Sequence, residues 1–279
     1  MASNPPGRCC TVGVKHEGEA KGEMKNIGET STYFSYPENK STENAVLILS
    51  DVIGHKFINP QLYVPNNAQT SLFPQRPAHV AHSPDAQHCR PVRSKRLLCR
   101  DAGPLPRRPH PLNRPEGFDI MKWLKGPPGH LPDRVDPVVE AVIKHMRNDL
   151  GVKKIGAVGY CFGGKYVARF MSKARRDAGQ GIDVGYTAHP SFVEADELKG
   201  VTGPLSIAAA ETDQIFPAEK RRESEDILKD MDIPYQLTLY SDVEHGFAVR
   251  ADTNDRRKKF AKEMAFEQAV VWFNEYLRE

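Results

Sequence analysis

The chain has 279 residues, of which 39% are hydrophobic and 27% are charged, a composition typical of an ordinary globular protein. Five cysteines show neither metal-ligand spacing nor a disulfide framework, so we expect no metal and a reducing, cytoplasmic location. Residues 63–110 hold the basic excess behind the net charge of +3, and no apolar run approaches a membrane span of about 18 residues. We therefore predict neither a nucleic-acid nor a membrane partner.

Two strands are predicted in the first part of the chain. Residues 31–36 read as a short strand. Residues 45–49 (AVLIL) form a continuous apolar run, which is typical of a strand buried on both faces of a parallel sheet. This second strand ends at residues 50–54, SDVIG.

The segment formed by residues 63–110 breaks this pattern. It is rich in proline and basic residues, has few branched or aromatic side chains, and shows neither helical nor strand periodicity. Such a composition buries too little apolar surface to offset the entropy lost on ordering. We therefore predict a long, exposed and irregular loop, no central strand within residues 63–110, and a badly filled position beside the strand at 45–49.

From residue 115 onward, predicted helices and strands alternate. The predicted strands are 154–159, 184–188, 204–210 and 235–240, and the predicted helices are 120–124, 136–149, 163–174, 218–231 and 260–277. Alternation of this kind predicts an α/β protein with a mostly parallel sheet and helices on both faces. The length suits a single domain over residues 1–279, interrupted at about 63–110.

The motif Gly159-Tyr160-Cys161-Phe162-Gly163 lies where a predicted strand ends and a helix begins. This is the context of the nucleophile elbow of α/β-hydrolases, G-x-S-x-G, with Cys161 in place of serine. Glycines two residues before and after the nucleophile avoid collisions with neighbouring backbone, and the helix N-terminus favours a thiolate. The Phe162 N–H is then available to an oxyanion hole. The alternative is a glycine-flanked core cysteine.

The other members of a catalytic triad follow the nucleophile in the order acid, then base. Asp213 and His245 come after two successive predicted strands, at the sheet edge where ligands bind in such folds. Glu211 is an alternative acid and His189 an alternative base, although the order favours His245. His189 is then a satisfied structural histidine or part of the site wall. Two further acidic residues nearby are candidates for solvated loop charges, Asp242 and Glu244.

Several strings together resemble fungal members of the dienelactone hydrolase (carboxymethylenebutenolidase-like) family. They are SDVIGH (50–55), GYCFGGKYVARF (159–170), TAHPSF (187–192), ETDQIFP (211–217) and EHGFAVR (244–250). The resemblance covers residues 9–62 and 111–279. It implies an α/β-hydrolase fold and a Cys161–His245–Asp213 triad.

The same resemblance suggests roles for three further residues. Asp51 stands where characterised members carry a glutamate that holds the resting thiol. The Val52 N–H is implied as a second oxyanion donor beside that of Phe162. Arg250 resembles the arginine that binds the substrate carboxylate, but it lies five residues after the histidine instead of four. This shift, and aspartate in place of glutamate, leave the choice of substrate open.

Within residues 63–110 the resemblance stops, and the reading frame offers an explanation. Residues 96–109 can be encoded by codons that, read one base later, give GYFVVMPDLFHGD, which matches the strand and loop that the family requires. We therefore hypothesise that residues 63–87 are a translated intron and that 88–110 are exon read out of frame. The alternative is a disordered, lineage-specific insertion.

These observations predict a cysteine-dependent hydrolase of small-molecule lactones or esters that uses no cofactor. A non-catalytic redox-sensitive or binding protein on a hydrolase fold is one alternative. An inactive product of faulty splicing is another. The sequence specifies neither the natural substrate, nor the pathway, nor the oligomeric state.

Overall fold

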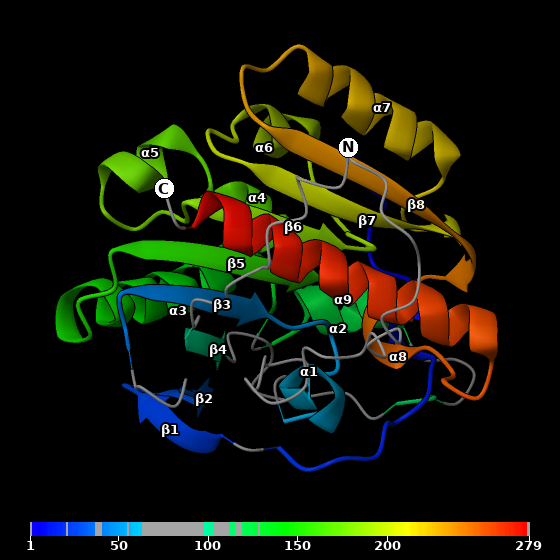
Figure 1. Cartoon of the computed structure of the whole chain (residues 1–279), viewed down its shortest axis with the longest axis horizontal. Coiled ribbons are helices and arrows are strands. Elements are labelled where there is room, and N and C mark those ends of the chain that lie inside the picture. Colours follow the sequence, from blue (N-terminus) through cyan, green and yellow to red (C-terminus); the bar gives the residue numbers. More distant parts are fainter. Residues whose placement is uncertain are drawn as a thin grey trace, which may run out of the picture.

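The computed structural model describes residues 2–20, 22–36, 41–54, 56–62, 98–102 (backbone), 112–114, 119–127 and 129–277. In this part of the chain an eight-stranded sheet has the order β1-β2-β4-β3-β5-β6-β7-β8 (Figure 1). The strands from β4 to β8 are parallel, whereas β1 and β2 form an antiparallel margin. The predicted mostly parallel sheet is therefore present.

The bounds of the elements follow the predicted alternation closely. The strands are β1 (Glu23–Ile27), β2 (Thr30–Ser35), β3 (Asn44–Leu49), β4 (Leu98–Ala102), β5 (Lys154–Tyr160), β6 (Val184–Ala188), β7 (Leu205–Thr212) and β8 (Tyr235–Glu244). The helical elements are η1 (Arg8–Thr11), α1 (Ile58–Leu62), α2 (Ile120–Lys125), α3 (Pro132–Lys144), η2 (His145–Asp149), α4 (Gly163–Phe170), α5 (Lys173–Asp177), α6 (Ala195–Lys199), α7 (Ala218–Lys229), α8 (Phe247–Arg250) and α9 (Arg256–Tyr276). Two predicted helices are each divided, into α3 and η2 and into α4 and α5.

Strand β3 shows why its sequence is apolar without interruption. Successive side chains of a strand point to opposite faces of the sheet. Leu47 belongs to the core that α3 and α4 cover, whereas Val46 and Ile48 belong to the core beneath α9. Figure 1 shows α9 crossing one face of the sheet and α3 and α4 lying on the other. Both faces are therefore buried, as the run at 45–49 predicted.

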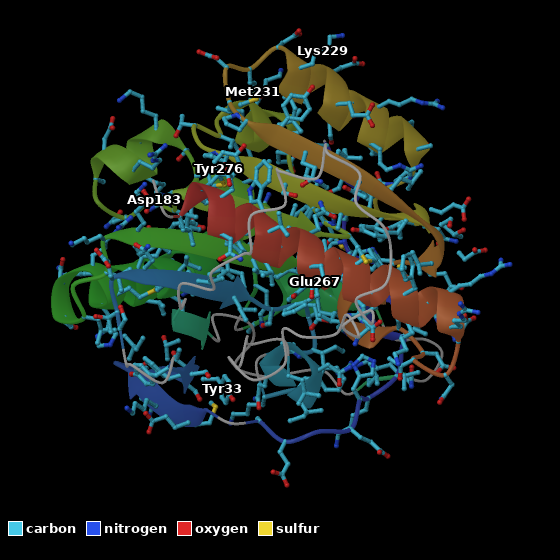
Figure 2. The ribbon with its side chains drawn as sticks, in the orientation of Figure 1. Tyr33, Asp183, Lys229, Met231, Glu267 and Tyr276 are labelled. Carbon is cyan, nitrogen blue, oxygen red and sulfur yellow. The ribbon has the colours of Figure 1, made fainter. Side chains whose placement is uncertain are left out.

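Two charged residues connect the strands at the edge where the parallel strands begin. Asp183 lies immediately before β6 (Figure 2). Its carboxylate accepts hydrogen bonds from the Ile155 N–H (2.7 Å) and from Arg147 Nη2 (2.6 Å). The carboxylate thus joins β5, β6 and η2 at this edge. The opposite edge, where the strands end, is left to the loops that carry the candidate catalytic residues.

The prediction that no central strand forms within residues 63–110 is wrong. Strand β4 (Leu98–Ala102) lies between β2 and β3, antiparallel to the first and parallel to the second. The sequence argument considered only side-chain burial. It neglected the backbone N–H and C=O groups of β2 and β3, whose hydrogen bonds a strand of any composition can satisfy. The remaining residues of that segment lie outside the described part.

No helix among the described residues is both long enough and apolar enough to span a bilayer.

Candidate active site

Five loops bring polar side chains to one edge of the sheet. Asp51 follows β3, Cys161 follows β5, His189 follows β6, Asp213 follows β7 and His245 follows β8. Because these strands are parallel, their carboxyl ends meet at the same edge, which is where ligands bind in open α/β sheets.

The turn at Cys161 has the geometry of a nucleophile elbow. Cys161 adopts a left-handed backbone conformation (φ 51°) between β5 and α4. A Cβ atom on Gly159 would lie 2.7 Å from the backbone of Gly163, and one on Gly163 would lie 1.9 Å from the Leu49 carbonyl oxygen. The predicted need for glycine at both positions is confirmed. A positive φ at a non-glycine residue costs about 1–3 kcal/mol, and such strain is typical of functional sites.

The Cys161 side chain is buried and held by the loop after β6. Its backbone N–H donates to the Ala188 carbonyl (3.1 Å), and its carbonyl accepts from the Ser191 N–H (3.0 Å). Its Sγ atom lies 3.6 Å from Ser191 Oγ. These contacts fix the elbow against the end of β6. The position of the sulfur is therefore set mainly by the backbone hydrogen bonds of the turn that carries it.

His245 and Asp213 form a buried hydrogen-bonded pair. His245 Nδ1 lies 2.9 Å from Asp213 Oδ2 and 3.0 Å from Oδ1. Oδ1 also accepts from the Ile215 N–H (2.7 Å) and the Phe216 N–H (3.0 Å), which fix the carboxylate. The carboxylate therefore places the proton on Nδ1 and leaves Nε2 facing the sulfur atoms.

The same pairing shifts both pKa values in opposite directions. Burial alone would raise the pKa of Asp213, but His245 and two backbone N–H donors hold it below its usual range. Burial alone would lower the pKa of His245, but the Cys10 sulfur and the Asp213 carboxylate hold it well above its usual range. The carboxylate therefore stabilises the imidazolium ion that forms when His245 accepts a proton.

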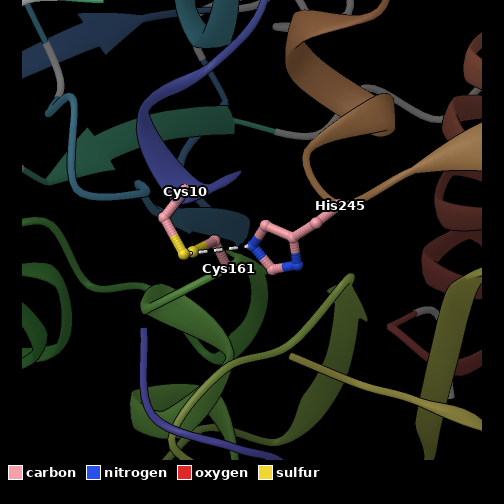
Figure 3. A group of neighbouring side chains, drawn as sticks. All are labelled: Cys10, Cys161 and His245. Carbon is pink, nitrogen blue, oxygen red and sulfur yellow. Dashed lines mark hydrogen bonds between the residues drawn. The ribbon is translucent and has the colours of Figure 1, made fainter. Parts of the chain in front are cut away.

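A second thiol, which the sequence did not predict, lies in the site. Cys10 Sγ is 3.4 Å from His245 Nε2, and the reactive atoms of Cys10, Cys161 and His245 all lie within 4.8 Å of one another (Figure 3). Cys10 lies in η1 near the N-terminus and is fully buried. Its pKa is raised, first by burial and then by the contact with Cys161. Among the described residues, these three side chains form a group whose ligand atoms are close enough together to hold a metal ion.

Asp51 pairs with Arg250 and not with Cys161. The Asp51 carboxylate contacts Arg250 Nη1, and both side chains are buried. Its other oxygen accepts from the Ile53 N–H (3.0 Å). The expectation that Asp51 holds the resting thiol finds no contact among the described residues, because the nearby buried guanidinium takes the carboxylate instead.

Arg250 lies in α8, immediately after the His245 loop. Two of its three guanidinium nitrogens have partners among the described residues, and the third does not. Nε donates to the Val12 carbonyl (3.1 Å) and Nη1 contacts Asp51, whereas Nη2 has no partner in the described part of the chain. Burial lowers the pKa of Arg250 to about 10, so the side chain remains charged at neutral pH. A buried charged donor without a partner is costly, and a ligand acceptor would satisfy it.

The two backbone donors suggested for an oxyanion hole are both buried. Val52 follows Asp51 at the end of β3, and Phe162 follows Cys161 at the start of α4. Gly163 packs directly on the Leu49 carbonyl, which brings the start of α4 against the end of β3. The two loops that carry these donors are therefore in contact.

The alternative residues considered from the sequence occupy other environments. His189 is buried with its ring centroid 5.0 Å from that of His245, and neither of its ring nitrogens has a described partner, so it is a wall residue but not a satisfied one. Burial and then His245 hold its pKa well below the usual value. The three acidic residues considered beside Asp213 have other partners: Glu211 accepts from the Asp242 N–H, Asp242 contacts the exposed Arg257, and Glu244 contacts the partly exposed Lys258.

A hollow of about 410 Å³ opens beside the histidine. His245 and Arg250 both line it, together with Gln214 and the charged residues Arg8, Lys258 and Glu244. The edge of the site therefore offers a small molecule both the imidazole and a buried guanidinium.

Comparison with known proteins gives a consistent result. A model of the dienelactone hydrolase family matches residues 78–277. Over the whole length of both chains, the protein is 44% identical to hydrolase pyvD of Aspergillus violaceofuscus and 46% identical to hydrolase tropI of Talaromyces stipitatus. A putative dienelactone hydrolase structure from Klebsiella pneumoniae superposes with a TM-score of 0.62 at 13% identity, covering 91% of this chain and 98% of that one. The α/β-hydrolase fold predicted from the sequence is confirmed.

Proposed function

Because this chain belongs to the dienelactone hydrolase family and hydrolyses ester or lactone bonds, we propose that it does so with a Cys161–His245–Asp213 triad. The observation that carries this proposal is the orientation of His245. Its Nδ1 is held by Asp213, and its Nε2 faces a sulfur on a nucleophile elbow within 4.8 Å. Thiol–imidazole distances of this size are common before substrate binds.

The reaction begins with transfer of the Cys161 thiol proton to His245 Nε2. The sulfur then attacks the carbonyl carbon of the substrate, and the N–H groups of Phe162 and Val52 stabilise the oxyanion. The C–O bond breaks, and the leaving oxygen takes the proton from His245. A water molecule, deprotonated by His245, hydrolyses the thioester and restores the thiol of Cys161.

The hollow beside His245 supports a substrate that carries an anionic or strongly polar oxygen. Arg250 is held in place by Asp51 and Val12, and its Nη2 is the donor without a described partner. In this account Asp51 positions the substrate-binding arginine instead of holding the thiol. Such a role requires that the pair remain intact, since a buried guanidinium without its carboxylate is strongly destabilising.

The thiols also support a reducing compartment, such as the cytoplasm. Cys9, Cys10 and Cys161 are free thiols in the structure, and Cys10 and Cys161 lie side by side in the site. A nucleophile next to a second thiol stays available only where disulfides are kept reduced.

Kinetics of the Cys161→Ala variant test the proposal. Hydrolysis of p-nitrophenyl acetate or a dienelactone should fall by about 1,000-fold or more, as removal of a triad nucleophile usually does. Cys9→Ala removes a neighbouring thiol outside the triad and is the matched control for loss of a cysteine. Turnover by Cys161→Ala at the rate of the unmodified protein would contradict the proposal.

A further inference from the structure

Three soft or borderline metal ligands converge at the edge of the sheet. Cys10, Cys161 and His245 come from η1, from the elbow after β5 and from the loop after β8, and all three are buried (Figure 3). Their ligand atoms lie within 4.8 Å of one another. Thiolate and imidazole are the ligand types that zinc prefers in proteins.

The distances are close to those of a tetrahedral zinc site. Zn–S bonds of about 2.3 Å and Zn–N bonds of about 2.0–2.1 Å place ligand atoms roughly 3.5–3.8 Å apart. Cys10 Sγ and His245 Nε2 are already 3.4 Å apart. The widest separation in the group, at most 4.8 Å, must shorten by about 1 Å, which corresponds to a rotation of roughly 30–35° about χ1 of one thiol.

The surroundings of His245 match those of a zinc-bound histidine. A metal-binding imidazole usually donates its other ring N–H to a carboxylate, which fixes the tautomer and the ring orientation. His245 Nδ1 makes this hydrogen bond to Asp213, at 2.9 Å. The Nε2 lone pair is therefore directed at the two sulfur atoms in the orientation that metal binding requires.

The geometry points to a binding site for a thiophilic divalent cation, Zn²⁺, formed by Cys10, Cys161 and His245. Binding releases the two thiol protons and forms two Zn–S bonds and one Zn–N bond. Two thiolates balance the charge of the ion, so the buried site carries no net added charge. A fourth ligand, water or another small molecule, would enter from the hollow, which His245 lines but Cys10 and Cys161 do not.

Zinc bound here would act as a reversible inhibitor. It occupies the sulfur that attacks the substrate and the nitrogen that takes the proton, and substrate and ion therefore exclude each other. This consequence rests on the proposed function, whereas binding itself depends only on the three side chains.

Titration with Co²⁺, a spectroscopic substitute for Zn²⁺, tests the site without measuring activity. The protein, fully reduced and free of metal, should develop a thiolate-to-cobalt charge-transfer band that saturates at one equivalent and disappears when Zn²⁺ is added. Cys10→Ser and Cys161→Ser should each weaken Co²⁺ binding by at least about 10-fold, since losing even an outer-shell partner costs about 10- to 100-fold. Cys9→Ser should bind Co²⁺ like the unmodified protein.

The cysteines outside the site are present in Cys10→Ser, in Cys161→Ser and in the unmodified protein. Any Co²⁺ bound at those cysteines therefore contributes equally to all three titrations. Circular dichroism and thermal unfolding establish that each variant is folded. No charge-transfer band, or equal Co²⁺ affinity in Cys10→Ser and the unmodified protein, would overturn the metal site. A band with normal hydrolysis in saturating Zn²⁺ would support the site and would contradict the catalytic roles of Cys161 and His245 instead.

Discussion

His245 Nε2 lies 3.4 Å from Cys10 Sγ, although the two residues are 235 positions apart in the chain. The N-terminal segment is fixed beside the site by backbone hydrogen bonds from Ser3 to Val193 and from Val14 to Arg250. The site therefore contains two thiols with different surroundings. Cys161 lies on the elbow, at the start of α4, whereas Cys10 lies in η1, outside the elbow, and burial raises its pKa. This contrast makes Cys161 the nucleophile in our account.

Replacing the two neighbouring histidines should have very different effects. His245→Ala removes the proposed base and should lower kcat/KM for p-nitrophenyl acetate by about 1,000-fold or more. His189→Ala removes a wall residue and should cost less than about 10-fold, well below the 100- to 10,000-fold contributed by a general base. Thermal unfolding separates activity loss from instability in the buried His189 variant. A larger kinetic loss in His189→Ala than in His245→Ala would reverse the assignment of the base.

Asp213→Asn should lower the rate by about 100- to 10,000-fold while the chain remains folded, because the amide no longer orients the imidazole or stabilises its charge. The loss should appear mainly in kcat. Alanine substitution of Glu211, the exposed alternative acid, serves as the matched control and should have little effect. An inactive Glu211→Ala protein together with an active Asp213→Asn protein would show that Glu211, and not Asp213, is the acid of the triad.

The pKa of His245 predicts how stability depends on pH. It is raised in the folded chain above the unfolded value of about 6.5, so protonation stabilises the fold. This contribution is fully present below about pH 6.5 and is lost as the pH rises through the folded pKa. In Asp213→Asn the raised pKa should fall, and the loss should move to lower pH. Urea unfolding across the pH range measures the stability, and the ¹⁵N-imidazole signals of His245 measure its pKa. The same His245 titration in Asp213→Asn and in the unmodified protein would contradict the pairing.

The buried pair of Asp51 and Arg250 should matter for stability as well as for substrate binding. Asp51→Asn leaves an uncompensated buried guanidinium and should cost about 3–5 kcal/mol in the free energy of unfolding. The double variant Asp51→Asn/Arg250→Gln should be more stable than the sum of the single changes predicts, since the unpaired charge is gone. Additive losses would mean that the contact contributes little. Arg250→Gln should raise KM more than it lowers kcat.

The sequence predicted the features that depend on local pattern. Residues 45–49 and the alternation after residue 115 indicated the parallel sheet, and Gly159 and Gly163 indicated the sharp turn at Cys161. Cys10 was missed because it lies in a short N-terminal turn without periodicity, and only the fold brings it to His245. The Asp51–Arg250 pair was missed because these two residues, too, are brought together only by the fold. Two residues assigned separate roles by resemblance prove to contact each other.

Strand β4 was missed because its proline-rich and basic surroundings argued against a strand. The reading-frame hypothesis for this segment can itself be tested. Leu98–Ala102 pairs by its backbone with β2 and β3 at the position where the shifted frame encodes FVVMP. Interior parallel strands are usually apolar, so a chain with the restored reading should be more soluble and more stable. Sequencing the transcript across codons 60–112 should reveal an intron. A continuous transcript without an intron boundary would contradict the hypothesis.

The most direct test of the account is to locate the acyl group during turnover. Asp213→Asn protein, in which deacylation is slow, is mixed with p-nitrophenyl acetate, quenched in acid and analysed by peptide mass spectrometry. Cys161→Ser and Cys10→Ser versions of the same protein serve as matched controls. We predict an acetyl thioester on Cys161, formed within one turnover and present in the Cys10→Ser version. An acetyl group on Cys10 or Ser191, or none on Cys161, would contradict the proposed nucleophile.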